Sequence, residues 1–195
     1  MGALRTPREK WVEQGLRALA DGGVDAVRVE ALAKALGVTK GGFYGYFADR
    51  DALLEAMLDT WERESTDDVL DRIEADGGDV RDKARRAGQL TFSGDRLLPI
   101  DLAVRDWARR DEAVAERLRR VDNRRMHLLR DAISTFCPDP GEVEARALLA
   151  FCTAIGSHFL AADHPGRTRA EVIARAADLI LDGPPGDHPP RARRA

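Results

Sequence analysis

The chain has little cysteine and no long apolar run. Its 195 residues include only two cysteines, Cys137 and Cys152, which is too few for a disulfide scaffold or a zinc site with four thiolates. No segment approaches the roughly 18–20 consecutive apolar residues of a membrane span, and the N-terminus lacks the apolar run of a secretory signal. We therefore expect a cytoplasmic protein without a membrane partner, in which both thiols are reduced and buried.

The chain also lacks a large excess of either charge. Its 31 Lys and Arg residues against 34 Asp and Glu residues give a net charge of −3. The charge is uneven, because residues 1–50 hold eight basic and six acidic residues, a balance of +2, whereas the rest of the chain holds 23 and 28, a balance of −5. A basic N-terminal part on an acidic body is typical of a DNA-reading module joined to a separate partner-binding domain.

β-strand patterns are lacking as well. Apolar residues recur at spacings of three and four almost everywhere, and no long stretch alternates with a period of two, so the sequence predicts an all-α fold. The first helix is expected to begin at Thr6 and Pro7 and to end at Gly22 and Gly23. After the first fifty residues, helices are expected at about 50–75, 80–92, 98–109, 111–136, 141–162 and 168–182.

The N-terminal part contains two short helices joined by a tight turn. Residues 30–36 predict the first of them, which ends at Gly37. The second is expected to start near Thr39, a capping residue, and to carry Phe43 and Phe47 on one face as core residues. This arrangement is a helix-turn-helix pattern, in which the second helix enters the major groove of DNA.

Residues 25–54 read DAVRVEALAKALGVTKGGFYGYFADRDALL. With its Gly-Val-Thr turn, its Tyr-x-Tyr-Phe ending and the basic residue before the next apolar segment, this stretch resembles the DNA-binding signature of TetR-family transcriptional regulators. Two positions depart from the family pattern. Arg28 stands where the family usually has a capping Thr or Ser, and Gly45 stands where many members have a larger side chain.

The resemblance implies a function and a domain organisation. The function is that of a sequence-specific transcriptional regulator, a repressor that binds a palindromic double-stranded DNA operator as a homodimer and is released by a small apolar or amphipathic effector. An activator or a regulator that needs no ligand is the alternative. A three-helix helix-turn-helix domain would cover residues 1–50, and a helical ligand-binding and dimerisation domain residues 51–183. The Pro-rich, basic residues 184–195 are expected to form a disordered tail, and no cofactor is expected.

Residues of the turn and of the helix that follows it are candidates for DNA contact. Thr39, Lys40 and Tyr44 are expected to face base edges in the major groove. Gly41 and Gly42 leave the exposed side of the helix bare, so that its backbone can come close to DNA; a weakly helical turn is the alternative. The expected phosphate contacts, which set register without reading sequence, are Arg28, Tyr46 and Arg50, with Arg8 and Lys10 beside them.

The helix expected over residues 141–162 carries a stripe of small residues beside an apolar face. Small residues let helices pack closely, and together with the last helix this pair has more apolar surface than one helical layer needs. We therefore expect a homodimer formed through a four-helix bundle. The predicted interface residues are Ala147, Ala150, Ala154, Ser157, Ala161, Val172, Ala176 and Ile180.

Large apolar side chains in the acidic domain could enclose an effector or could be ordinary core. The candidate pocket residues are Met57, Trp61, Phe92, Trp107, Met126, Phe151 and His158. His158 is the expected orienting polar group, and a histidine of the dimer interface is the alternative for it.

The chain lacks the residue constellations of an enzyme. His158 and His164 lie six apart and on opposite helix faces, which argues against a metal site. Cys137 and His127 show no sign of an oriented nucleophile and base, and the glycine spacing of a phosphate-binding loop is missing. An architectural DNA binder would need basic surface over most of its length, which the acidic body does not offer. We therefore expect no catalytic activity and no metal.

Overall fold

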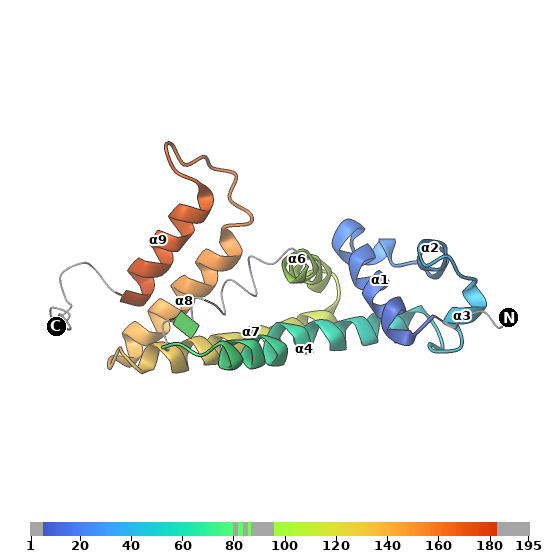
Figure 1. Ribbon diagram of the computed structural model, residues 1–195, viewed down its shortest axis with the longest axis horizontal. Helices are drawn as coiled ribbons and strands as arrows, with labels where there is room; N and C mark the ends of the chain where they lie inside the picture. The colour runs from blue at the N-terminus through green and yellow to red at the C-terminus, as the bar shows by residue number, and fades with distance from the viewer. Residues whose placement is uncertain (1–5, 80–81, 84–85, 87–95, 183–195) are drawn as a thin grey trace.

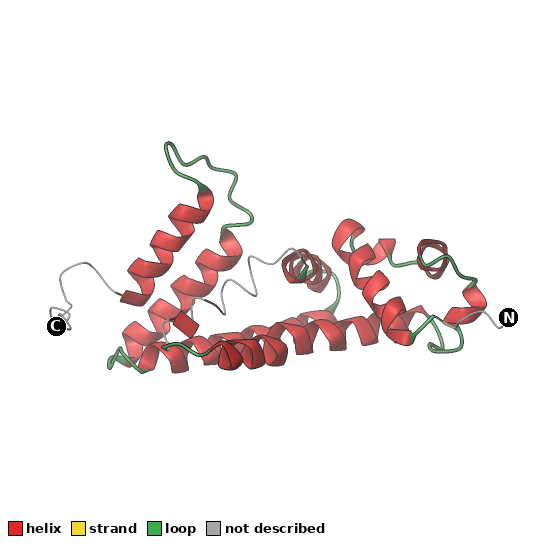
Figure 2. Ribbon diagram, in the orientation of Figure 1, coloured by secondary structure: helices red, strands yellow, loops and turns green. Residues whose placement is uncertain are grey.

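The computed structural model describes residues 6–79, 82–83, 86 and 96–182 (Figure 1). Over these ranges the fold is all-α, as predicted, and contains no strand (Figure 2). Short helices form a head at the N-terminal end, two long helices run away from it, and a helical pair stands at the other end. The elements are α1 (Arg8–Gly22), the 3-10 helix η1 (Val24–Ala26), α2 (Val29–Ala35), α3 (Lys40–Phe43), α4 (Arg50–Asp76), α6 (Leu97–Ala108), α7 (Glu112–Ser134), α8 (Pro140–Gly156) and α9 (Arg169–Asp182).

Most helices begin and end close to the predicted positions. α8 is shorter than expected, because it ends at Gly156 and the chain then turns; glycine is a poor helix former. α3 ends at Phe43 and does not continue to Phe47. The predicted helix over 80–92 falls largely outside the described residues, and the predicted tail over 184–195 falls entirely outside them. None of the described helices is long and apolar enough to cross a membrane.

Aspartate side chains cap three of the helices. Asp49, Asp111 and Asp139 accept hydrogen bonds of 2.7–3.2 Å from backbone N–H groups in the first turns of α4, α7 and α8, which satisfies donors that have no partner within the helix. The predicted caps Thr6 and Thr39 were wrong. Pro7 holds the capping position of α1, and the Thr39 side chain makes no capping hydrogen bond to α3.

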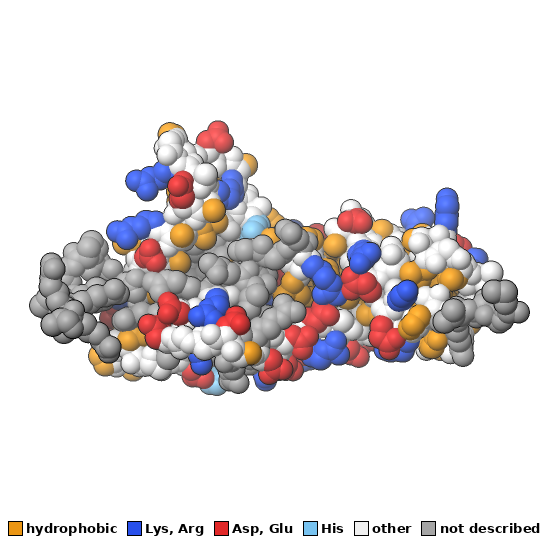
Figure 3. All heavy atoms as spheres, viewed as in Figure 1, with side chains coloured by type: hydrophobic (Ala, Val, Ile, Leu, Met, Phe, Trp, Pro, Cys, Tyr) orange, Lys and Arg blue, Asp and Glu red, His pale blue; other side chains and the backbone are white. Residues whose placement is uncertain are grey.

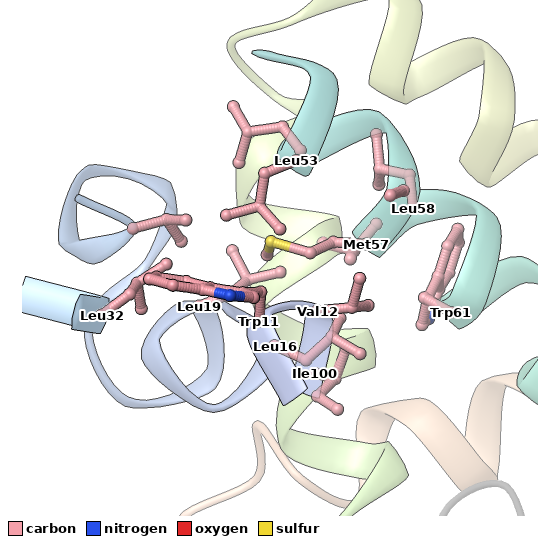
Figure 4. Packing of buried hydrophobic residues seen from close by; sticks show 14 of the residues in the cluster. Trp11, Val12, Leu16, Leu19, Leu32, Leu53, Met57, Leu58, Trp61 and Ile100 are labelled. Atoms are coloured by element: carbon pink, nitrogen blue, oxygen red, sulfur yellow. The ribbon is translucent and has the colours of Figure 1, made fainter. Parts of the chain in front are cut away.

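The main hydrophobic core joins the head to the long helices (Figure 4). Trp11 of α1 and Trp61 of α4 are fully buried in it, and Ile100 of α6 packs against the same cluster. α1 and α4 are closest where Gly15 faces Met57. A Cβ atom on Gly15 would lie 2.5 Å from the Met57 Sδ, so a larger residue would displace a methionine that is itself fully buried.

A second, smaller core lies at the other end of the molecule. It joins the end of α7 to α8 and α9, and its buried members are Ile133, Cys137, Val143, Ala147 and Leu181. Cys137 is thus buried, as predicted. Cys152 is exposed, so the prediction of a buried thiol was wrong there.

Arg96, at the start of α6, ties the head to α4. Its Nη2 donates to Glu13 Oε2 of α1 at 2.6 Å, and its Nη1 donates to Glu64 Oε2 of α4 at 2.5 Å. The hydrogen bond from Arg96 lowers the pKa of the Glu13 carboxyl. The head is therefore joined to the rest of the chain by polar contacts as well as by the main core.

Charged side chains of both signs lie along the two long helices, as the face in Figure 3 shows. Arg117 of α7 donates to Glu55 Oε2 and to Asp59 Oδ1 of α4, each at 2.6 Å. Arg124 of α7 donates to Asp67 Oδ1 of α4 at 2.7 Å. These ion pairs connect α4 and α7 side by side, and their arginines are neutralised by carboxylates.

Candidate nucleic-acid interface

α2 and α3 are joined by the tight turn that the sequence predicted. Gly37 adopts φ +67°, the left-handed conformation that glycine takes at little cost. Behind α3, the centroid of the Phe43 ring lies 5.4 Å from that of Trp11 and 5.2 Å from that of Phe47. Both phenylalanines are buried, as predicted. The helix-turn-helix is therefore held against the core of the head from behind.

The outer side of α3 faces solvent. Thr39, Lys40 and Tyr44, the predicted base contacts, are all exposed, and Tyr44 has 60% of its surface accessible. A Cβ atom added at Gly41 or at Gly42 would meet no atom closer than 3.8 Å. At Gly42 the nearest atom is Cζ2 of the buried Trp11, and Gly42 is half-buried, so the prediction that it leaves the exposed side bare needs correction. Gly41 is exposed, and the backbone there is open to an approaching partner.

Lys40 is paired with an acid that the sequence analysis did not single out. Its Nζ donates to Glu30 Oε1 on α2, and both side chains are more than half exposed. The hydrogen bond from Lys40 lowers the pKa of the Glu30 carboxyl, and the same bond raises the pKa of Lys40. Both groups are therefore charged at neutral pH, and the candidate DNA contact at Lys40 has a carboxylate beside it.

Arg50 has partners within the chain that the sequence analysis did not predict. Its Nε donates to the Val27 carbonyl and its Nη2 to the Val24 carbonyl, each at 2.6 Å. These hydrogen bonds fasten the start of α4 to the segment before α2, and the phosphate contact of Arg50 stays a prediction. Arg28 is exposed and donates to the Asp25 carbonyl at 3.0 Å, which leaves it at the surface of the head.

Replacing Arg50 by alanine is expected to lower the free energy of unfolding by about 2 kcal/mol, because two carbonyl groups lose a charged donor. Arg50→Lys should recover only part of the lost free energy of unfolding, since an ammonium cannot reproduce the planar fork of a guanidinium. Thermal denaturation measures both variants, with Arg28→Ala as the control that removes an exposed arginine. Unchanged stability of Arg50→Ala would show that these two hydrogen bonds do not stabilise the fold, and a phosphate contact would remain as the role of Arg50.

The predicted pocket residues do not lie together. Met57, Trp61 and Trp107 are buried in the main core, near the head. Met126 is half-buried and packs against the second core. These side chains therefore pack at two places in the chain, and the pocket that they were expected to form stays a prediction.

The other pocket candidates lie towards α8. Phe151 is half-buried, with its ring centroid 5.8 Å from the Arg105 guanidinium of α6. His158 is exposed just after α8 ends, so it does not point into a closed pocket. Phe92 lies outside the described residues.

A buried charged cluster beside Phe151 escaped the sequence analysis. Asp101 of α6 is fully buried and accepts hydrogen bonds from Trp61 Nε1 at 3.2 Å, from Arg105 Nε at 2.9 Å and from Arg125 Nη2 at 2.9 Å. Arg105 also donates to both carboxylate oxygens of Asp122. The sequence feature that could have revealed this cluster is Asp101, an acid in the middle of an apolar helix, with Arg105 four residues later. Within the described ranges, no three His, Cys, Asp or Glu side chains are placed to hold a metal ion.

α8 exposes a different face from the predicted one. Ala147 is fully buried in the second core, so its side chain has no surface left for a partner, and that prediction needs correction. Leu148 and Leu149 are instead 53% and 55% exposed, and Leu179 of α9 is 48% exposed. Among the remaining predicted interface residues Ala161 is exposed, and those that are half-buried are Ala150, Ala154, Ser157, Val172, Ala176 and Ile180.

Residues 12–57, which include most of α1, the helix-turn-helix and the first turns of α4, match the family model of bacterial regulatory proteins, tetR family. This match confirms the resemblance of the N-terminal segment to the TetR family. The predicted fold, a helix-turn-helix head followed by a helical domain, is also confirmed.

Solved structures show the same fold over nearly the whole chain. A transcriptional regulator from Rhodococcus sp. Rha1 is 22% identical, with a TM-score of 0.68 over 91% of this chain and 95% of that one. The regulator FadR from Bacillus subtilis, solved with stearoyl-CoA, is 14% identical, with a TM-score of 0.65 over 91% and 100%. AibR, solved with isovaleryl coenzyme A and operator DNA, is 15% identical, with a TM-score of 0.64 over 90% and 98%. None of the curated proteins matches this chain.

Proposed function

We propose that this protein is a transcriptional repressor of the TetR family that acts in the cytoplasm and binds a palindromic duplex operator through α3. The observation that carries the proposal is the exposed side of α3, where Lys40, Gly41 and Tyr44 face solvent and a Cβ on Gly41 would meet no atom closer than 3.8 Å. A helix with a bare backbone can approach the major groove closely, and the exposed side chains can reach base edges and phosphates. Residues 1–50 would form the DNA-binding domain.

We also propose that two copies bind together. One recognition helix reads only a few base pairs, and a two-fold dimer doubles the contacts and fixes the spacing of the half-sites. The exposed leucines of α8 and α9 support a partner there, because adjacent large apolar side chains in solvent mark an interaction surface. The second copy would cover Leu148, Leu149 and Leu179, and residues 51–183 would form the regulatory and dimerisation domain.

The effector is proposed to be a small apolar or amphipathic molecule that binds the helical domain and weakens DNA binding. Support comes from proteins of the same fold, since FadR was solved with stearoyl-CoA and AibR with isovaleryl coenzyme A and operator DNA. The coupling expected between effector and operator is on the order of 1–3 kcal/mol.

Selection from random duplexes tests the function directly. The full-length protein is expected to enrich one inverted repeat, with half-sites about one helical turn apart. Acyl-CoA esters of different chain lengths are then added to the operator complex in an anisotropy assay, and an effector should lower the affinity and be recovered unchanged. Enrichment of no motif would contradict the DNA-reading role, and steady consumption of the ester would favour an enzyme.

A further inference from the structure

The pair formed by Glu30 and Lys40 lies at the surface proposed to meet DNA. Glu30 is in the first turn of α2, and the neighbouring residues Val29, Leu32 and Ala33 are buried and fix that helix on the head. The carboxylate is therefore held on a rigid element beside α3. Its partner Lys40 is the first residue of α3 and is one of the predicted base contacts.

The ion pair is exposed and can be exchanged for another partner. The side chain of Lys40 is 53% exposed and that of Glu30 is 64% exposed, and ion pairs in water are weak and screened by salt. A base acceptor on DNA can therefore take Lys40 from Glu30, because such an acceptor is neutral and the Glu30 carboxylate does not repel it. The carboxylate that remains also repels nearby phosphates, whether or not Lys40 has moved.

We propose that Glu30 is a specificity-determining residue that keeps Lys40 from binding DNA where the sequence offers it no base acceptor. On an operator, guanine O6 and N7 are acceptors at a defined place in the major groove, and Lys40 leaves Glu30 for them. On other sequences only phosphates are within reach, and Lys40 stays with Glu30. This inference rests on the proposed DNA-binding function, and it assigns to an acidic residue the suppression of binding to other sequences.

Neutralising Glu30 is therefore expected to strengthen binding to unrelated DNA more than binding to the operator. Glu30→Gln frees Lys40 for a phosphate, and each additional phosphate contact steepens the dependence of log K on log salt by about 0.9. Affinity for a scrambled duplex should rise about three- to tenfold at low salt, and affinity for the operator should change by less than about threefold. Fluorescence anisotropy over a salt series measures both affinities with full-length protein.

Glu116→Gln is the matched control. Glu116 is likewise exposed and paired with an arginine, Arg119, but it lies on α7, away from α3. Glu116→Gln removes one negative charge from the chain, as Glu30→Gln does, so the ratio of operator affinity to scrambled-duplex affinity should stay as in the wild type. Equal ratios for Glu30→Gln and Glu116→Gln would overturn the inference.

A second pair of variants tests whether Glu30 acts through Lys40. In a Lys40→Gln background, Glu30→Gln should leave the salt dependence unchanged, because there is no cation to release. If Glu30→Gln steepens the salt dependence equally in both backgrounds, Glu30 does not act by holding Lys40 and the inference fails. A wild type that shows no preference for any duplex would overturn the proposed function itself, whereas a selective wild type with an unaltered Glu30→Gln ratio would overturn this inference alone.

Discussion

Replacing Asp101 by alanine is expected to lower the free energy of unfolding by about 3–5 kcal/mol, because it leaves buried positive charge without its main acceptor. Asp101 is fully buried and accepts from Trp61, Arg105 and Arg125, and the side chain of Arg125 is only 7% exposed. Without Asp101, Arg105 keeps its hydrogen bonds to Asp122, but the buried Arg125 keeps Asp122 only at 3.6 Å and loses the shorter ion pair to Asp101. Urea denaturation followed by circular dichroism measures the change.

Asp106→Ala is the control on the same helix. Asp106 also pairs with an arginine four residues later, Arg110, but the side chains are 66% and 55% exposed. Surface substitutions of this kind change stability by about 0.5 kcal/mol or less. If Asp101→Ala and Asp106→Ala have the same small effect, the buried cluster does not hold α6 and α7 together.

Replacing Leu149 by arginine is expected to convert a dimer into monomers. Leu149 is 55% exposed within one chain, so the change should leave the subunit folded, while two-fold symmetry places two buried charges in one interface. Operator affinity should fall by about a hundredfold or more, since a single head keeps half of the base contacts and no fixed half-site spacing. Analytical ultracentrifugation and anisotropy measure the two effects.

Two further variants locate the interface. Ala113→Arg adds the same charge at an exposed site on α7, away from α8 and α9, and should leave both the dimer and operator binding intact. Ala154→Arg alters the half-buried small-residue stripe. Dissociation by Ala154→Arg with an intact Leu149→Arg dimer would show that the stripe, and not the exposed leucine face, meets the partner.

The elements could be predicted from the sequence because their signals are local. Glycine at position 37 marks a turn wherever the rest of the chain lies, and the turn occurs as expected. The roles of charged residues could not be predicted in this way. Arg50 lies 23 residues from the carbonyl of Val27, and Asp101 lies 40 residues from Trp61. Only the packing of separate helices determines such partners.

The prediction of Ala147 as an interface residue was wrong for a related reason. A small-residue stripe shows that α8 packs closely against something, but not whether that neighbour is in the same chain. Ala147 packs against the second core of its own subunit, and the more strongly apolar Leu148 and Leu149 remain outside. Periodicity identifies an apolar face, and the arrangement of α7 and α9 decides which part of that face is already covered.

The close contact of Gly15 with Met57 is a point about which α4 could tilt. The helix is 27 residues long, about 40 Å, and the contact lies about 10 Å from its first residue and about 28 Å from its last. If α4 tilts about this point as a rigid rod, its beginning moves about a third as far as its far end, in the opposite direction. A displacement near Asp76 would thus reach the head as a small rotation.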